Sequence, residues 1–150
     1  ELPDYTKNYR DIGQSNYLGI SNGAIFLKGI SQAFIESLGE VETRIFDWYL
    51  YSRLLLNKKK GKKINGCYTY YRIYEANLAG KCEWSRQAVK KEIEIKKEHY
   101  RLLTPYANYY KKLLQVYSST CTEQFTEQFA DQEMTGYWWS LTNIQLEEER

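Results

Sequence analysis

Histidine and cysteine are scarce in this chain of 150 residues, and their scarcity excludes several kinds of chemistry. His99 is the single histidine, so the histidine clusters that relaxases use cannot form, and a catalytic triad has one candidate base. The three cysteines, Cys67, Cys82 and Cys121, include no Cys-x-x-Cys pair and are too widely spaced for an ordinary zinc site. We therefore expect no metal and no cofactor.

Long apolar runs, signal-peptide features and glycosylation sequons are also missing. No apolar run reaches the roughly 18 residues that cross a bilayer, and the start of the chain does not combine basic residues, an apolar stretch and a cleavage site. An odd number of cysteines cannot form a complete disulfide framework within one chain. These absences favour a cytoplasmic protein with no membrane partner, whose three thiols are reduced and mostly packed.

Phosphate loops and clustered carboxylates, which would indicate an enzyme, are absent as well. The lysine run at residues 58–63 lacks the glycine pattern and the following Ser or Thr of a phosphate-binding loop. The basic middle of the chain holds few carboxylates for the metal cluster of a nuclease. His99 lies in a lysine-rich stretch and is expected at the surface. We therefore expect that the protein is not an enzyme.

The chain does contain enough apolar and aromatic residues for about one domain, which we expect to be mainly α with a small β component. Hydrophobic residues make up 43% and aromatic residues 16%, with 15 Tyr and 4 Trp. Apolar spacings of three and four residues predict helices, and alternation predicts short strands. The expected helices are residues 31–38, 40–56, 85–99 and 108–117, and the expected strands are residues 24–27, 67–73 and 102–103 before a turn at residues 104–105.

The most informative segment is residues 78–93, whose pattern predicts two short helices joined by a tight turn. Ser85 is suited to cap the second helix, and Val89 and Ile93 follow at a spacing that places them toward a core. Such a capped amphipathic helix is also common in helical proteins without any DNA-binding role. The outer face, however, keeps the side-chain types that recognise bases and contact phosphates, namely Arg86, Gln87, Lys90 and Lys91, with Lys97 further along.

Charge is distributed unevenly along the chain, although the net charge is only +2. Residues 53–112 are strongly basic, whereas residues 1–52 and 113–150 are both acidic. The basic block includes the motif and a lysine-rich loop around Gly61. Phosphate contacts require an electropositive surface around a recognition helix. The expected phosphate contacts in the loop are Lys58, Lys59, Lys60, Lys62 and Lys63.

The order of elements from about residue 24 to residue 106 resembles the winged helix-turn-helix DNA-binding domains of plasmid and phage proteins. That group includes replication initiators and transcription regulators. The apolar run at Ala24, the long helix after Gly39 and the sequence at residues 85–91 carry the resemblance. It implies that the helix containing Arg86 is the recognition helix and that residues 104–109 form the wing.

Two positions depart from the pattern of that family. Glu83 stands where many such turns carry Gly, so the turn must adopt a backbone conformation that does not require Gly. Lys96 stands where an apolar residue is usual. Either Ile95 takes over the packing role of that position or the helix ends earlier than residue 99.

The chain is expected to divide into an N-terminal arm (residues 1–23), a winged-helix domain (residues 24–117) and a C-terminal helix and tail (residues 118–150). The last part contains a tandem Thr-Glu-Gln-Phe, in which Phe125 and Phe129 share a helix face. That helix either packs on the same domain or joins two copies into a homodimer. The aromatic residues 137–139 are expected to anchor on the body or on a partner.

These patterns favour sequence-specific binding of double-stranded DNA by a protein of a mobile element, in replication, partition or transcription control. Two alternatives stay open. The first is a protein-binding module, such as a phage or plasmid antagonist of a host protein, and the second is a secreted helical effector. A steep fall in DNA affinity with salt favours DNA binding, absence of binding at low salt favours the protein-binding module, and a disulfide bond favours the effector.

Overall fold

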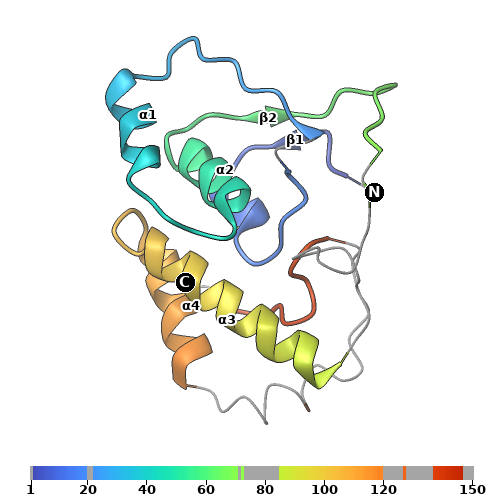
Figure 1. Cartoon of the computed structure of the whole chain (residues 1–150), viewed down its shortest axis with the longest axis vertical. Coiled ribbons are helices and arrows are strands. Elements are labelled where there is room, and N and C mark those ends of the chain that lie inside the picture. The colour runs from blue at the N-terminus through green and yellow to red at the C-terminus, as the bar shows by residue number, and fades with distance from the viewer. Residues whose placement is uncertain are drawn as a thin grey trace.

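A computed structural model describes residues 2–19, 22–70, 72, 85–119, 127 and 137–146. Within these residues the chain is mainly helical with a small antiparallel sheet, which confirms the expected fold class at that level (Figure 1). The elements in chain order are β1 (Tyr5–Thr6), the 3-10 helix η1 (Tyr9–Ile12), α1 (Gln32–Gly39), α2 (Phe46–Leu56), β2 (Gly61–Lys62), α3 (Arg86–Leu103) and α4 (Asn108–Ser119).

Serine caps determine where two of the helices begin. The Ser31 side chain accepts a hydrogen bond from the backbone N–H of Phe34, and the Ser85 side chain accepts one from Ala88. Each bond supplies an acceptor to an N–H group of the first turn, where the carbonyl four residues earlier is not available, and the Phe34 N–H also donates to the Ser31 carbonyl oxygen at 3.1 Å. The helices expected at residues 31–38 and 85–99 are therefore confirmed, although α3 continues beyond residue 99 to Leu103.

Helix α2 begins later than expected, at Phe46 rather than at residue 40. The segment before it is tied to α3 instead of being coiled. The Thr43 hydroxyl and the Arg44 backbone N–H both donate to the Glu98 carboxylate, at 2.6 and 3.2 Å. Since Glu98 binds these groups, residues 41–43 have no regular structure, residues 44–45 form a turn, and the helix begins at Phe46.

The expected strands are wrong. Residues 24–27 and 67–70 form no strand and are exposed, and residues 102–103 belong to α3; residues 71 and 73 lie outside the described residues. The sheet that does form pairs β1 with β2, with Tyr5 opposite Lys62 and Thr6 opposite Gly61. Cys67, expected to be packed, is exposed as a free thiol.

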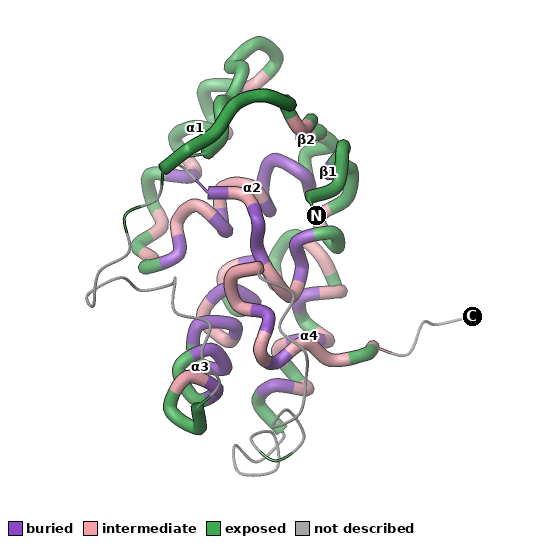
Figure 2. The backbone as a smooth tube through the Cα atoms, turned by 90° about the vertical axis from the view of Figure 1, so that its right-hand side faces the viewer, coloured by how far each residue is buried: buried purple, intermediate pink, exposed green. Residues whose placement is uncertain are grey.

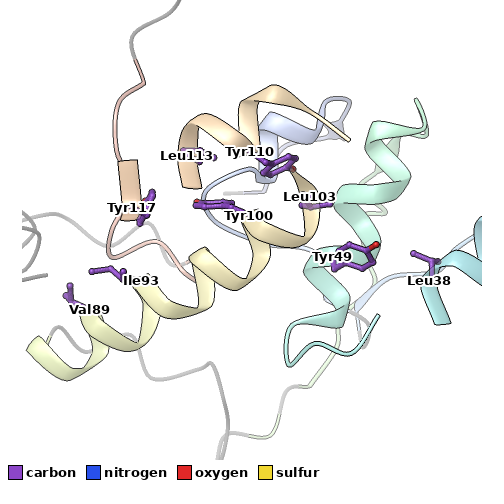
Figure 3. Close-up of a cluster of buried hydrophobic side chains, with 9 residues drawn as sticks. All are labelled: Leu38, Tyr49, Val89, Ile93, Tyr100, Leu103, Tyr110, Leu113 and Tyr117. Atoms are coloured by element: carbon purple, nitrogen blue, oxygen red, sulfur yellow. The ribbon is translucent and has the colours of Figure 1, made fainter. Parts of the chain in front are cut away.

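The larger core lies between α3 and α4, which pack along each other and are joined by a turn at residues 104–107, and it continues to Tyr49 on α2 and Leu38 on α1 (Figure 3). Tyrosine rings fill much of it in edge-on and tilted contacts, such as Tyr100 against Tyr117 at 5.4 Å between ring centroids. Such rings bury a large apolar area. The buried residues of this core are Leu38, Tyr49, Val89, Ile93, Tyr100, Leu103, Tyr110, Leu113 and Tyr117.

The N-terminal segment is not an arm, because it supplies part of a second core. Ile12 is fully buried and packs with Trp48 of α2, whose indole N–H donates to the Ile12 carbonyl oxygen at 2.6 Å. The Tyr17 hydroxyl lies 2.9 Å from the Thr6 hydroxyl within the buried interior. This segment therefore belongs to the same body as α2.

The C-terminal segment at residues 137–146 also packs on that body (Figure 2). Trp138 pairs with Asn16 through two backbone hydrogen bonds of 2.8 Å. The Gln14 side chain donates to the Ile144 carbonyl oxygen and accepts a hydrogen bond from the Ile144 backbone N–H. The Tyr137 ring lies 5.0 Å from the Tyr17 ring. The aromatic group thus anchors on the body, whereas the expected dimerisation helix falls on residues that, apart from Glu127, lie outside the described ones.

Candidate nucleic-acid interface

Helix α3 divides into a buried face and an exposed face along its whole length. Positions 89, 92, 93, 95, 96, 99, 100 and 103 are buried. The side chains expected to contact DNA near the start of the helix lie on the other face, and all four are exposed: Arg86, Gln87, Lys90 and Lys91. The expected core positions Val89 and Ile93 are fully buried or nearly so.

Positive charge on the exposed face is concentrated in the first two turns. Residues 85–91 contain no Asp or Glu. Further along, Lys97 lies 3.1 Å from Glu94, and Arg44 lies 2.7 Å from Glu98. Lys97 is therefore half-buried beside a carboxylate and is less available to a phosphate than the residues before it.

The basic loop expected to contribute phosphate contacts does not adjoin this part of α3. Figure 1 places β2, which lies within the loop, at the opposite end of the structure from the first residues of α3, and Figure 2 agrees. Lys58, Lys60 and Lys62 are exposed, but Lys59 and Lys63 are half-buried. The Lys59 ammonium donates to the Gly29 carbonyl oxygen at 2.6 Å. The structure therefore separates the residues expected to bind DNA into two groups.

Residues 104–109 do not form a wing. The Thr104 backbone N–H donates to the Tyr100 carbonyl oxygen, a turn follows, and α4 begins at Asn108. Pro105 occupies the turn, where its missing N–H removes no helical hydrogen bond. The segment expected to form a strand and a wing is the end of one helix and the beginning of the next. The first helix and turn of the motif, residues 78–84, lie outside the described residues.

No family model, curated protein or solved structure matches this chain. Interpretation of the site therefore depends on its own geometry. Among the described residues, no three His, Cys, Asp or Glu side chains come together as a metal site. None of the described helices is long and apolar enough to cross a bilayer.

A buried ion pair lies beneath the exposed face of α3. Lys96 is completely buried, and its ammonium lies 3.2 Å from the Glu92 carboxylate and 2.9 Å from the Asn143 side-chain oxygen. Burial lowers the pKa of Lys96 from 10.5 to about 8, although the Glu92 charge opposes this shift. Ile95 is buried as expected, but Lys96 is buried beside it, and α3 does not end early.

The Glu92 carboxylate also holds the C-terminal segment on α3. It accepts hydrogen bonds from the Thr142 backbone N–H and hydroxyl, both at 2.8 Å, and from the Leu141 backbone N–H at 3.2 Å. A charged acceptor with several donors is a stable arrangement for a buried carboxylate. The sequence could have indicated this pair, because residues 92 and 96 follow Val89 at spacings of three and four and so share its buried face of the helix.

His99 is buried and not at the surface, which corrects the expectation from its lysine-rich surroundings. Its ring stacks on Trp48 at 3.9 Å between centroids, and its Nε2 atom lies 3.4 Å from the Ser52 hydroxyl. Burial lowers the pKa of His99 well below 6.5, and the Lys96 charge lowers it further. The imidazole is thus neutral and supports the core where α2 crosses α3.

Proposed function

We propose that this chain binds double-stranded DNA through the first two turns of α3, in the manner of a recognition helix. The observation that supports this proposal is the grouping of Arg86, Gln87, Lys90 and Lys91 on one exposed face. Arg and Lys are the usual partners of guanine edges and phosphates, and Gln pairs with adenine. Replication, partition and transcription control of a mobile element all use contacts of this kind.

The helix dipole gives a second argument for the proposal. Cations near a helix N-terminus are unfavourable for the helix, because the partial charge there is also positive. Arg86, in the first turn of α3, therefore raises the free energy of the isolated fold, and Lys90 four residues later adds a like-charge repulsion. Residues that lower the stability of the fold in this way are expected where a surface serves to bind a ligand. An anionic backbone approaching this end would be attracted by both the side chains and the positive end of the helix dipole.

The resemblance to winged-helix proteins is part of the proposal in a narrower form. It depends on α3 and its Ser85 cap and no longer includes a wing at residues 104–109. The lysines of the loop at residues 58–63 are left out of this interface because they lie at the other end of the structure (Figure 1). The proposed interface therefore consists of one helix end.

The test is a titration of labelled random-sequence duplexes with the full chain at two salt concentrations. We expect affinity to fall steeply with salt. On a duplex selected from the random sequences for tight binding, the Arg86→Ala/Lys90→Ala variant should bind more weakly by about 1–3 kcal/mol for each base-edge hydrogen-bonding partner that it removes. The matched control is Lys60→Ala/Lys62→Ala, which removes two exposed cations from the far end and should leave affinity unchanged. Absence of binding at low salt, or an equal weakening in the control, would refute the proposal.

A further inference from the structure

The loop at residues 22–30 exposes three consecutive apolar side chains. Phe26 is 87% exposed, Leu27 is 66% exposed and Ile25 is 37% exposed. A turn shapes the loop just after them, where the Ile30 backbone N–H donates to the Leu27 carbonyl oxygen at 2.9 Å and Gly29 has a φ of +78°. Figure 1 shows the segment before α1 arching over the end of the structure that also carries β2.

Lysines surround this apolar tip, which consists of residues 25–27. Lys28 follows it directly, and Lys59 reaches the loop through its hydrogen bond to the Gly29 carbonyl oxygen. Residues 22–30 and 57–66 contain six lysines and no Asp or Glu. The neighbouring elements contribute Asp4, which precedes β1, and Glu36, on α1. The tip therefore combines strong local positive charge with exposed hydrophobic surface.

The tip is apolar at its end and basic around it. Phe26 and Leu27 are both exposed to a degree that is uncommon for large apolar side chains in such a row. A medium that surrounds the tip on all sides can bury both side chains at once. The acyl region of a lipid bilayer is such a medium, and its anionic headgroups complement the lysines.

We infer that this end of the molecule binds the surface of an anionic lipid bilayer. Phe26 and Leu27 insert below the headgroups, while Lys28 and the exposed lysines of the loop at residues 58–63 contact the phosphate and carboxylate groups of the lipids. This association is peripheral and involves no membrane-spanning helix. It uses none of the residues of α3 that are proposed to bind DNA, so it does not rest on that function.

The experiment is co-sedimentation of the full chain with vesicles of phosphatidylcholine alone and with vesicles that also contain about 30% phosphatidylserine. We expect binding to the anionic vesicles and little to the neutral ones. Phe26→Ala/Leu27→Ala should weaken partitioning by about tenfold or more, because two large apolar side chains no longer insert. Lys60→Gln/Lys62→Gln should weaken it by about tenfold as well, and added salt should reproduce that effect.

Tyr68→Ala is the matched control, because Tyr68 is 88% exposed and lies outside the tip. Its binding to anionic vesicles should equal that of the unmodified chain. Equal binding to both kinds of vesicle, or an equal weakening in the Tyr68 variant, would overturn the inference. Absence of vesicle binding together with duplex binding that depends on Phe26 would also overturn it, and would identify the tip as a wedge between base pairs. All substituted side chains are exposed, so circular dichroism should show unchanged folding.

Discussion

His99 shows how one buried side chain makes the stability of this protein depend on pH. Its folded pKa lies well below the ordinary 6.5, so the unfolded chain takes up a proton at a higher pH than the folded chain. The free energy of unfolding should therefore fall as the pH drops below about 6.5, with a slope approaching about 1.4 kcal/mol per pH unit. Urea unfolding between pH 7 and pH 5 measures this slope.

The control for His99 is His99→Phe, which keeps an aromatic ring against Trp48 but cannot titrate. The difference in unfolding free energy between this variant and the unmodified chain should change with pH in that window. Two parallel curves would show that His99 is not the group responsible. The Nδ1 atom of His99 has no hydrogen-bond partner among the described residues, so the substitution breaks no hydrogen bond at that atom.

Lys96 leads to a second prediction for a single residue. Lys96→Met leaves the Glu92 carboxylate buried without its cation, so we expect it to destabilise the fold by about 3–5 kcal/mol at neutral pH. Adding Glu92→Gln should recover part of this stability, because no uncompensated charge then remains. Chemical denaturation of the unmodified chain, the two single variants and the double variant gives the coupling energy. A double variant less stable than Lys96→Met alone would contradict this account.

At the scale of elements, helix starts were predictable from the sequence where local chemistry decides them. Ser31 and Ser85 cap their helices through their own side chains, and both starts were expected. The start of α2 depends on Glu98, which is far away in the sequence, and no local pattern contains it. The apolar run at residues 24–27 has the composition of a strand, but a strand also needs a pairing partner, and the structure provides none there among its described residues.

The positive charge at the N-terminal end of helix α3 should lower the stability of the fold. Arg86→Glu places a carboxylate at the N-terminal end of the helix and opposite Lys90 one turn later, so we expect a gain of about 0.5–1 kcal/mol in the free energy of unfolding. The same substitution should remove DNA affinity. The matched control is Arg101→Glu in the last turn of the same helix, which should lower stability and leave DNA affinity unchanged. Thermal unfolding and duplex titration of both variants test this pair of opposite effects.

The end of α2 carries a strain that a single substitution should relieve. Lys58 has a φ of 60°, and the N–H groups of Lys58 and Lys59 donate to the carbonyl oxygens of Leu55 and Leu54. This is the left-handed helix ending that glycine usually occupies. Lys58→Gly should therefore raise the free energy of unfolding by about 0.5–1 kcal/mol. Lys60→Gly, at a position without a positive φ, should lower it, and the reverse order in denaturation experiments would contradict the argument.

At the scale of the whole molecule, the N-terminal and C-terminal segments close the structure around α2, α3 and α4. Residues 5–17 and 137–146 pair with each other through Asn16 and Trp138 and also pack on the helices. These long-range contacts explain why the sequence alone indicated separate segments. An N-terminal stretch with few apolar residues is typical of an arm, and only the partner groups on α2 and on the C-terminal segment show that it is part of the core.

Removal of the C-terminal segment should therefore destabilise the rest of the structure. A chain truncated after residue 136 lacks the donors from Leu141 and Thr142 to Glu92 and the Asn143 oxygen on Lys96, and it exposes both buried charges. We expect stability to fall by at least about 3 kcal/mol, because Glu92 loses its hydrogen bonds and the apolar surfaces that the segment covers in both cores meet water. Truncation after Leu146 is the control, since it keeps every one of these hydrogen bonds and should unfold at the same denaturant concentration as the full chain. Equal stability of the two truncated chains would mean that Glu92 and Lys96 do not depend on the C-terminal segment, and that α3 and α4 form a core sufficient by themselves.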